Sequence, residues 1–328
     1  MVFKNKGQPL IYEELPIPIP SSHQILIKVY ACGVCRTDLH IFEGDLINPE
    51  LPLIPGHQIV GDIVSWGKDV TGFKKGERIG IAWLGKTCQQ CYFCKNSQEN
   101  LCDRPLFTGY TTSGGYAEYA VCDSRYCFSL PEKFDDLHVA PLLCAGMVGF
   151  RSLHKVLFAE TIGFYGFGSS ASLLIQTALS MNKRIYAFTK EGNLISQQLA
   201  IDLGATWAGD CSTLPPLLLD AAIIFAPIGE LVPLSLKAIR KGGTVVLGGI
   251  HMSQIPSFSY DLLWGERTLT STANLTRQDG HDYFKVISAA KIYPLITVYP
   301  LSKANEAITD LKAGRIKGSL VLQVSSRD

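Results

Sequence analysis

The amino-acid sequence predicts an α/β protein that combines a β-rich part with a doubly wound parallel sheet. In the first 140 or so residues, strand-like runs are separated by turns rich in proline and glycine. From about Asp136, short apolar strands alternate with segments of helical periodicity. This alternation implies right-handed crossovers between parallel strands. The length of 328 residues is enough for about two domains.

The predicted elements follow in chain order. The β-rich part contains strands at Gln24–Tyr30 and Ile59–Val64. The alternating part contains strands at Thr161–Tyr165, Arg184–Thr189, Ala221–Phe225, Thr244–Leu247 and Thr268–Ser271, and helices at Ser169–Met181 and about 230–240. The second helix should end before residues 241–243, and a last strand is predicted at Ser319–Val324.

Composition excludes several functional classes. A net charge of +1 offers no electrostatic basis for binding nucleic acid or an anionic membrane. No apolar run approaches the roughly 20 residues that cross a bilayer. The N-terminal residues lack the apolar core and cleavage site of a signal peptide. We therefore expect a soluble, cytoplasmic protein without nucleic-acid or membrane partners.

Four of the ten cysteines form a local quartet, Cys88-x2-Cys91-x2-Cys94-x7-Cys102. Four thiolates within 15 residues are the number that a closed tetrahedral zinc site uses. The alternative is a surface loop of reduced, unliganded thiols. Four protein ligands leave no position for a substrate, so the spacing predicts a structural rather than a catalytic zinc site.

A second group of reactive side chains precedes the quartet. Within six residues the chain carries the thiol of Cys35, the hydroxyl of Thr37, the carboxylate of Asp38 and the imidazole of His40. Downstream, His57 lies in a turn that opens a strand. Taken alone, this group is a moderate indication of a metal or catalytic site.

Both segments, the quartet and residues 140–146 resemble the zinc-dependent alcohol dehydrogenases of the medium-chain dehydrogenase/reductase superfamily, in order over nearly the whole chain. The resemblance implies a GroES-like catalytic domain at 1–144 and 272–328 that carries both zinc sites. It also implies a Rossmann domain at 145–271 that binds NAD(P).

The resemblance implies a second, catalytic zinc ion with an open coordination position. Its ligands would be Cys35, His57 and Cys144. Thr37 would accept the proton of the alcohol, and His40 would receive it through the coenzyme ribose. Asp38 would hold the ring of His57, with turn capping as its alternative role. Buried, unliganded side chains are the competing interpretation of the three ligands.

The glycine-rich segment from Gly166 to Ala171 follows a predicted strand and opens a helix, as a dinucleotide-binding fingerprint requires. Gly166 would permit the tight turn, and Gly168 would let the backbone approach a pyrophosphate. Ser169 and Ser170 complete this cofactor-binding loop. Arg36 lies where the family often places a basic side chain on the pyrophosphate, although it could equally be a surface charge.

The end of the second Rossmann strand bears on coenzyme choice. A site that prefers NAD usually has an acidic residue here for the ribose 2′-hydroxyl. This chain has Thr189 and Lys190, with Glu191 one residue later. A hydroxyl and an ammonium suit a 2′-phosphate better than a carboxylate, so the sequence favours NADP over NAD.

The predicted reaction is reversible hydride transfer between a primary or simple secondary alcohol and NAD(P). A polyol or cinnamyl-type alcohol dehydrogenase would share the same motifs, and a non-catalytic zinc- and nucleotide-binding relative is the alternative from another class. The expected partner is a small alcohol or aldehyde, and the family implies a homo-oligomer, either a dimer or a tetramer. Trp83 and residues 106–110 are possible apolar lining of the pocket. The chain departs from the family at Gln58, where glutamate is usual.

Overall fold

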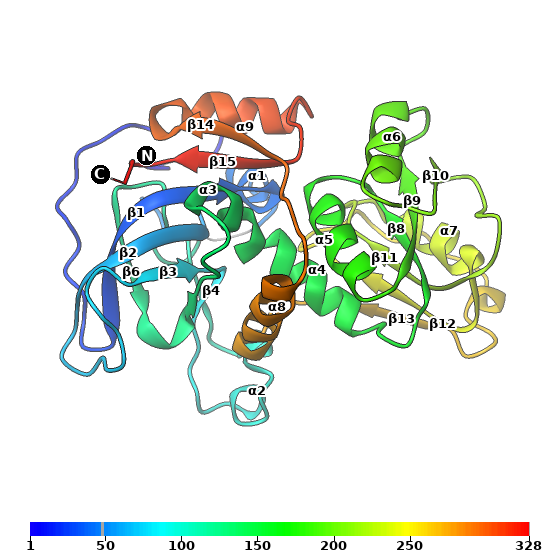
Figure 1. Ribbon diagram of the computed structural model, residues 1–328, viewed down its shortest axis with the longest axis horizontal. Helices are drawn as coiled ribbons and strands as arrows, with labels where there is room; N and C mark the ends of the chain where they lie inside the picture. The colour runs from blue at the N-terminus through cyan, green and yellow to red at the C-terminus, as the bar shows by residue number, and fades with distance from the viewer. Residues whose placement is uncertain (47–48, 328) are drawn as a thin grey trace. The chain divides into compact units, whose positions relative to one another are not determined.

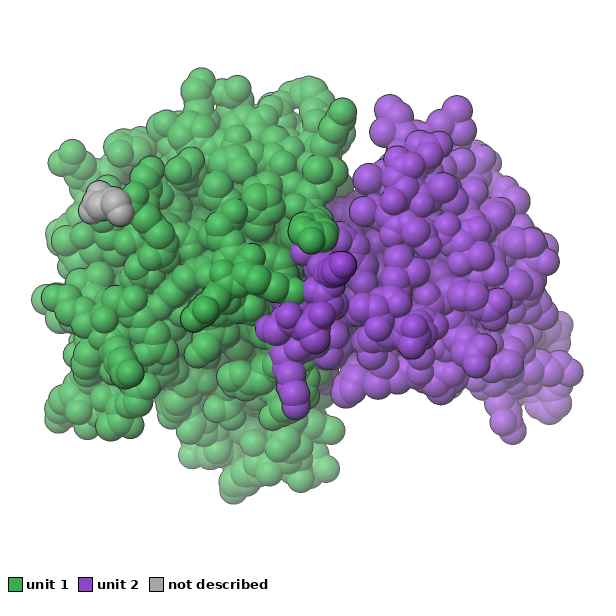
Figure 2. Space-filling view, in the orientation of Figure 1, with its two compact units in different colours: residues 1–144, 274–284, 293–328 green, residues 145–273, 285–292 purple. Residues whose placement is uncertain are grey.

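The computed structural model describes residues 1–46 and 49–327, which form two compact units. The first unit comprises residues 1–144, 274–284 and 293 onward, drawn in green in Figure 2. The second comprises residues 145–273 and 285–292, drawn in purple. The sequence predicted that 272–328 belong to one domain as a single piece, whereas residues 285–292 cluster with the second unit. The binding roles assigned to the two parts stay predictions.

The first unit is built on a seven-stranded sheet of order β14-β15-β1-β2-β3-β7, in which β6 also pairs with β1 (Figure 1). Its strands are β1 (Gln24–Val34), β2 (Gln58–Trp66), β3 (Arg78–Ile81), β6 (Tyr119–Asp123), β7 (Cys127–Ser129), β14 (Ile296–Pro300) and β15 (Ser319–Gln323). Among the described strands of this sheet, only β14 and β15 pair in parallel, and the other pairs are antiparallel. A separate two-stranded sheet joins β4 (Leu84–Lys86) to β5 (Leu106–Phe107).

Strand β1 is longer than the sequence predicted because two strands, β6 and β15, pair in succession along the edge that β2 does not cover. Its first half pairs with β6 and its second half, from Ala31 to Val34, pairs with β15. Ile25, Ile27 and Val29 alternate along it and are fully buried in the core. The strand runs to Val34 and therefore delivers the next residue, Cys35, to the start of a helix.

The helices of the first unit are short. The α-helices are α1 (Arg36–Glu43), α2 (Tyr92–Lys95), α3 (Asp136–Val139) and α9 (Ala304–Lys312), and α8 (Arg277–Ala289) begins here and ends in the second unit. Four 3-10 turns accompany them: η1 (Glu99–Leu101), η2 (Ser124–Tyr126), η3 (Ala140–Leu143) and η5 (Leu301–Lys303). No helix in the described part of the chain has the length and hydrophobicity needed to span a membrane.

The second unit contains six parallel strands of order β10-β9-β8-β11-β12-β13. The strands are β8 (Thr161–Tyr165), β9 (Arg184–Thr189), β10 (Trp207–Asp210), β11 (Leu219–Ile224), β12 (Ile239–Leu247) and β13 (Thr268–Ser271). The helices are α4 (Ala145–His154), α5 (Ser169–Ser180), α6 (Leu194–Asp202) and α7 (Leu231–Ala238), with the turn η4 (Tyr260–Leu262). In order of appearance the strands read 3-2-1-4-5-6, which is the Rossmann order, so the predicted doubly wound sheet is confirmed.

Successive side chains of a strand point to opposite faces of this sheet and pack into two different hydrophobic cores, one on each face. Phe164 packs with residues of α4, α5 and α6, whereas the next residue, Tyr165, packs with residues of α7. One local prediction is wrong. The helix predicted at about 230–240 ends at Ala238, and residues 239–243 already belong to β12, in which Gly242 has a φ of +72°.

Candidate metal centres and active site

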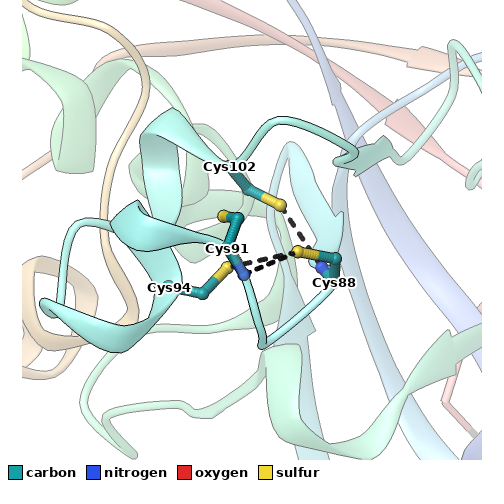
Figure 3. A group of neighbouring side chains, drawn as sticks. All are labelled: Cys88, Cys91, Cys94 and Cys102. Atoms are coloured by element: carbon teal, nitrogen blue, oxygen red, sulfur yellow. Dashed lines mark hydrogen bonds between the residues drawn. The ribbon is translucent and has the colours of Figure 1, made fainter.

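The four cysteines of the quartet gather around one point in the loop between β4 and β5. Their sulfur atoms all lie within 4.8 Å of one another, and Figure 3 shows the side chains converging. The Sγ atoms of Cys88 and Cys94 are 4.0 Å apart. Two sulfurs bound to a tetrahedral zinc ion at about 2.3 Å lie about 3.8 Å apart. The quartet therefore fits a zinc ion held by four thiolates.

Backbone N–H groups point at these sulfurs. Cys88 accepts from the N–H of Cys91 at 3.4 Å, and Cys102 accepts from the N–H groups of Cys88 and Arg104 at 3.3 and 3.4 Å. Hydrogen bonds from the backbone of Gln90 and Cys91 lower the pKa of the Cys88 thiol to about 6. Burial raises the pKa of Cys102 to about 11. Because two adjacent thiolates repel each other, ionisation of one thiol raises the pKa of its neighbour. A bound cation offsets this repulsion and favours the thiolate form of both.

Two polar contacts, one buried and one partly buried, anchor this predicted zinc loop within its unit, and sequence reasoning missed both. The Oγ1 atom of Thr87 lies 2.6 Å from the hydroxyl of Tyr126 and 3.4 Å from the Sγ of Cys94. The carboxylate of Glu99 accepts from the backbone N–H and the Nε of Arg277, at 3.0 and 3.2 Å. The Arg277 guanidinium in turn lies 5.1 Å from the centre of the Tyr126 ring. No sequence signal marks pairs so far apart along the chain.

The three predicted ligands of the catalytic zinc come from separate segments of the first unit. Cys35 precedes α1, His57 precedes β2 and Cys144 follows η3. Their ligand atoms lie within 4.8 Å of one another, and the Sγ of Cys35 is 3.3 Å from the Nε2 of His57. A sulfur and a nitrogen on one tetrahedral zinc ion lie about 3.5 Å apart. The structure thus brings all three together in an arrangement that suits zinc.

Asp38 faces the other side of the His57 ring. Its Oδ1 lies 3.6 Å from the Nδ1 of His57, and both residues are fully buried. Neither of these two atoms has a hydrogen-bond partner in the described part of the chain. The other oxygen, Oδ2, accepts from the N–H of Cys35 at 2.8 Å. One carboxylate therefore both caps α1 and faces the histidine.

The charges around these residues favour a cation. Burial lowers the pKa of His57, but the Cys35 thiolate and the Asp38 carboxylate outweigh it and raise the pKa to about 10. A hydrogen bond from the Cys144 thiol holds the pKa of Cys35 well below its usual range. The buried pocket thus stabilises a thiolate and a positive charge beside it. A divalent cation meets both conditions.

Helix α1 carries the other predicted catalytic residues. Thr37 and His40 are three residues apart, so they lie on the same helical face. The Thr37 hydroxyl donates to the Cys35 thiolate and helps to lower its pKa. His40 is buried at 7% exposure, whereas Arg36 at the start of the helix is exposed.

Gln58, the departure from the family, follows His57 directly and is 1% exposed. Its side chain covers Gly33, because a Cβ atom at that glycine would lie 2.7 Å from the Oε1 of Gln58. The Nε2 atom is buried and has no hydrogen-bond partner in the described part of the chain. A neutral amide therefore occupies a buried position directly beside a predicted zinc ligand.

Aromatic side chains form a wall beside His57. The ring of Trp83 meets the imidazole edge-on, with centroids 5.1 Å apart. Phe107 and Tyr110 stack on Trp83 with centroids 5.1 and 5.6 Å away. Leu106, which the sequence grouped with these residues, is 38% exposed. The structure therefore places Trp83, from the predicted apolar lining, against the predicted metal ligand His57, with Phe107 and Tyr110 behind it.

The glycine-rich turn of the second unit has the shape of a phosphate-binding loop. Gly166 has a φ of +87°, and a Cβ there would lie 2.8 Å from the Cβ of Ala226. Gly168 is the N-cap residue of α5 and is exposed. A Cβ atom added at this glycine would meet no other atom within 4 Å. The half-buried Ser169 and Ser170 form the first turn of α5. The N-cap Gly168 makes no side-chain hydrogen bond to α5, and backbone N–H groups at a helix N-terminus suit a pyrophosphate.

At the end of β9, the two residues predicted to contact a 2′-phosphate differ in their exposure to solvent. Thr189 is only 2% exposed, and its hydroxyl bonds to Gly209 and Gln197 within the unit. Lys190 is exposed. The nearby carboxylates are engaged, because Asp210 accepts from the N–H of Gly192 at 3.0 Å and Glu191 accepts from Ser212 at 2.9 Å.

Comparison with known proteins decides the family. The family model "Alcohol dehydrogenase GroES-like domain" matches residues 21–132. A probable alcohol dehydrogenase AdhA of Mycobacterium tuberculosis is 40% identical over 316 residues, which cover 94% of this chain and 91% of that protein. The chain belongs to the zinc-dependent alcohol dehydrogenases of the medium-chain dehydrogenase/reductase superfamily. Its reaction is therefore an NAD(P)-dependent oxidation or reduction between an alcohol and its carbonyl compound.

Other relatives support the same family and the same fold for this dehydrogenase. An alcohol dehydrogenase of Geobacillus stearothermophilus is 33% identical and covers 95% of both chains. The structure of acetophenone reductase from Geotrichum candidum in complex with NAD superposes with a TM-score of 0.89 at 24% identity, covering 98% of this chain and 96% of that one. The structure of CAD from Helicobacter pylori complexed with NADP(H) superposes with a TM-score of 0.88 at 24% identity, covering 98% of this chain and 96% of that one. These structures confirm the GroES-like and Rossmann fold.

Proposed function

We propose that this dehydrogenase holds a catalytic zinc ion and a structural zinc ion at two separate sites. The observation that supports this is the presence of two clusters, one with three donor side chains and one with four. Three protein ligands leave a coordination position for a substrate oxygen, whereas four do not. When bound at Cys35, His57 and Cys144, zinc supplies Lewis-acid polarisation of that oxygen.

The chain's own residues orient and move the substrate proton in this proposal. Thr37 lies beside Cys35, and its hydroxyl accepts the proton of the alcohol while donating its own onward. His40, on the same face of α1, is the final acceptor. Asp38 holds the His57 ring from the side opposite the thiol.

The aromatic wall indicates the substrate class. Trp83 contacts His57 edge-on, and Phe107 and Tyr110 stack on Trp83. Such surfaces stabilise apolar groups and offer few partners for the hydroxyls of a polyol. We therefore propose a simple primary or secondary alcohol with an apolar substituent, and an aryl alcohol of the cinnamyl type is the second candidate that the same wall favours.

For the coenzyme we propose NADP in preference to NAD. The loop from Gly166 through Gly168, Ser169 and Ser170 would bind the pyrophosphate, and Arg36 would add a positive charge. Lys190 is the exposed cation at the end of β9, and the neighbouring Glu191 is bonded to Ser212. The buried Thr189 supports the turn from within. We also propose a homo-oligomer, for which β13 offers a sheet edge that no described strand covers.

A panel of alcohols assayed with NAD+ and NADP+ at the nicotinamide absorbance tests the proposal, together with zinc analysis of the purified protein. We expect turnover of apolar alcohols over polyols, a higher kcat/KM with NADP+, and two zinc ions per chain. Polyol oxidation that exceeds apolar alcohol oxidation would contradict the substrate class. One zinc ion per chain without turnover would leave only the structural site.

A further inference from the structure

Two free thiols that belong to neither predicted zinc site lie against each other in the first unit. The Sγ atoms of Cys122 and Cys127 are 3.3 Å apart. We propose that this pair is a modification site, at which a small peroxide joins the two thiols in a reversible disulfide. The inference goes beyond the proposed function, because neither cysteine binds zinc, coenzyme or alcohol in that proposal.

The fold brings the two sulfur atoms together from different strands of the seven-stranded sheet. Cys122 lies in β6 and pairs with Ile25 of β1, whereas Cys127 begins β7 and pairs with Ile81 of β3. The sulfur atoms of a disulfide are about 2.05 Å apart, so these two need to approach by about 1.2 Å. Small side-chain rotations supply a shift of that size while both strands keep their pairing.

The surroundings of the two thiols differ in their access to solvent. Cys122 is 6% exposed and belongs to the main core of the unit, whereas Cys127 is half-buried and packs against that core. The Cys127 thiol donates to the carbonyl of Asp123 at 3.4 Å, and the Cys122 thiol to that of Ile25 at 3.9 Å. An oxidant therefore meets Cys127 first. A molecule as small as hydrogen peroxide suits a half-buried sulfur better than a bulky disulfide.

The oxidation takes place in two balanced steps. The Cys127 thiolate attacks one oxygen of hydrogen peroxide, the O–O bond breaks, and a sulfenic acid and hydroxide form. The Cys122 thiol then gives up its proton and attacks the sulfenic sulfur, so that the S–S bond forms and the S–O bond breaks. Together the two thiols lose two electrons and two protons, and the peroxide becomes two water molecules. A dithiol reductant reverses the reaction by thiol–disulfide exchange and is itself oxidised to a disulfide.

The closeness of the two sulfurs affects both steps. The contact with Cys122, burial, and the carboxylates of Asp123 and Glu77 raise the pKa of the Cys127 thiol well above its usual range. Because the thiolate is the nucleophile, the first step should be slow and need an excess of peroxide. A sulfenic acid at Cys127, once formed, already has Cys122 beside it. The second step should therefore outrun further oxidation to a sulfinic acid.

The disulfide would close a ring around the turn η2. This turn carries Tyr126, whose hydroxyl lies 2.6 Å from the Oγ1 of Thr87, next to the first cysteine of the quartet. A bond across the two ends of η2 restricts this segment in the unfolded chain and stabilises the folded one. The oxidised protein should therefore resist unfolding better than the reduced protein with the same zinc content.

The experiment is peptide mapping by mass spectrometry of the zinc-loaded full chain after treatment with excess hydrogen peroxide and alkylation of the remaining thiols. Trypsin cleaves after Arg125, so the disulfide would join two separate peptides. We expect this crosslinked species in most chains, with loss of alkylation at Cys122 and Cys127, and its disappearance on reduction with dithiothreitol. Cys122→Ser should lose the crosslink, and Cys211→Ser, which removes a distant thiol, should keep it.

A second measurement is the urea midpoint of unfolding before and after peroxide treatment, at equal zinc content. It should rise in the wild type and in Cys211→Ser but not in Cys122→Ser. Wild-type protein in which Cys127 is oxidised to a sulfinic acid while Cys122 stays free would overturn the proposal. So would a map without the crosslink, or a crosslink that forms equally well when the chain is unfolded in urea before oxidation.

Discussion

The Sγ of Cys35 lies 3.3 Å from the Nε2 of His57, although 22 residues separate them. The opposite nitrogen of the same ring faces the carboxylate of Asp38 at 3.6 Å. The imidazole is thus held between two anionic groups in a fully buried position. This arrangement presents Nε2 and the thiolate together, as a shared metal ligand set requires.

Asp38→Asn should weaken zinc binding at this site. The substitution keeps the shape but removes the charge that orients and polarises His57. We expect zinc affinity to fall about 10- to 100-fold, measured by competition with a chromophoric chelator. Asp69→Asn is the control, because Asp69 faces the exposed His23 at 3.9 Å. Equal affinities for Asp38→Asn and the wild type would show that the carboxylate serves only as a cap.

Tyr126→Phe should loosen the zinc loop. It removes the hydroxyl that bonds to the buried Thr87, itself in contact with Cys94. We expect the free energy of unfolding in urea to fall by about 1 kcal/mol or more, because the Thr87 hydroxyl loses its partner in a buried setting. Tyr260→Phe changes the same group at 67% exposure and should have no effect. Equal free energies of unfolding for Tyr126→Phe and Tyr260→Phe would show that the bond to Thr87 does not stabilise the loop.

Part of this architecture could be predicted from local sequence. The quartet lies within 15 residues, and the strands β8, β9 and β13 are short apolar or β-branched runs next to clear turns. Such signals act over a few residues, so periodicity and spacing reveal them. β10 was not predicted, because Trp207–Asp210 has no apolar run of its own and becomes a strand by pairing with β9.

The remaining features depend on contacts between distant segments. Cys35, His57 and Cys144 could be linked only through the family resemblance, because nothing local ties them together. The bond between Glu99 and Arg277 joins residues 178 positions apart. The burial of Thr189 depends on the neighbouring β10, so its exposure could not be judged from the end of β9 alone.

Gln58→Glu should alter the catalytic zinc site. We expect the neutral amide to leave a bound zinc ion more electrophilic than the carboxylate usual in the family would. We expect the added negative charge to tighten zinc retention and to change kcat, either one by at least about threefold. Gln8→Glu adds the same charge at an exposed position and controls for net charge. Unchanged kcat and zinc affinity in Gln58→Glu would refute the hypothesis.

Lys190→Ala should reduce the preference for NADP. Loss of the exposed ammonium removes a partner for a 2′-phosphate and leaves NAD untouched. We expect kcat/KM for NADP+ to fall about tenfold and that for NAD+ to stay within about twofold. Lys237→Ala, another exposed lysine of the second unit, should change neither value. A wild-type protein that clearly prefers NAD+ would contradict this account before any variant is made.

The two proposed zinc ions have two different roles, one catalytic and one structural. These roles are tested most directly by the zinc content per chain of the wild type, Cys144→Ser and Cys94→Ser, measured beside turnover and thermal stability. We expect two zinc ions in the wild type. Cys144→Ser should lose one ion and its activity while keeping its melting temperature near the wild-type value, and Cys94→Ser should lose the other ion and stability. A Cys144→Ser protein that retains two zinc ions or full turnover would contradict these roles.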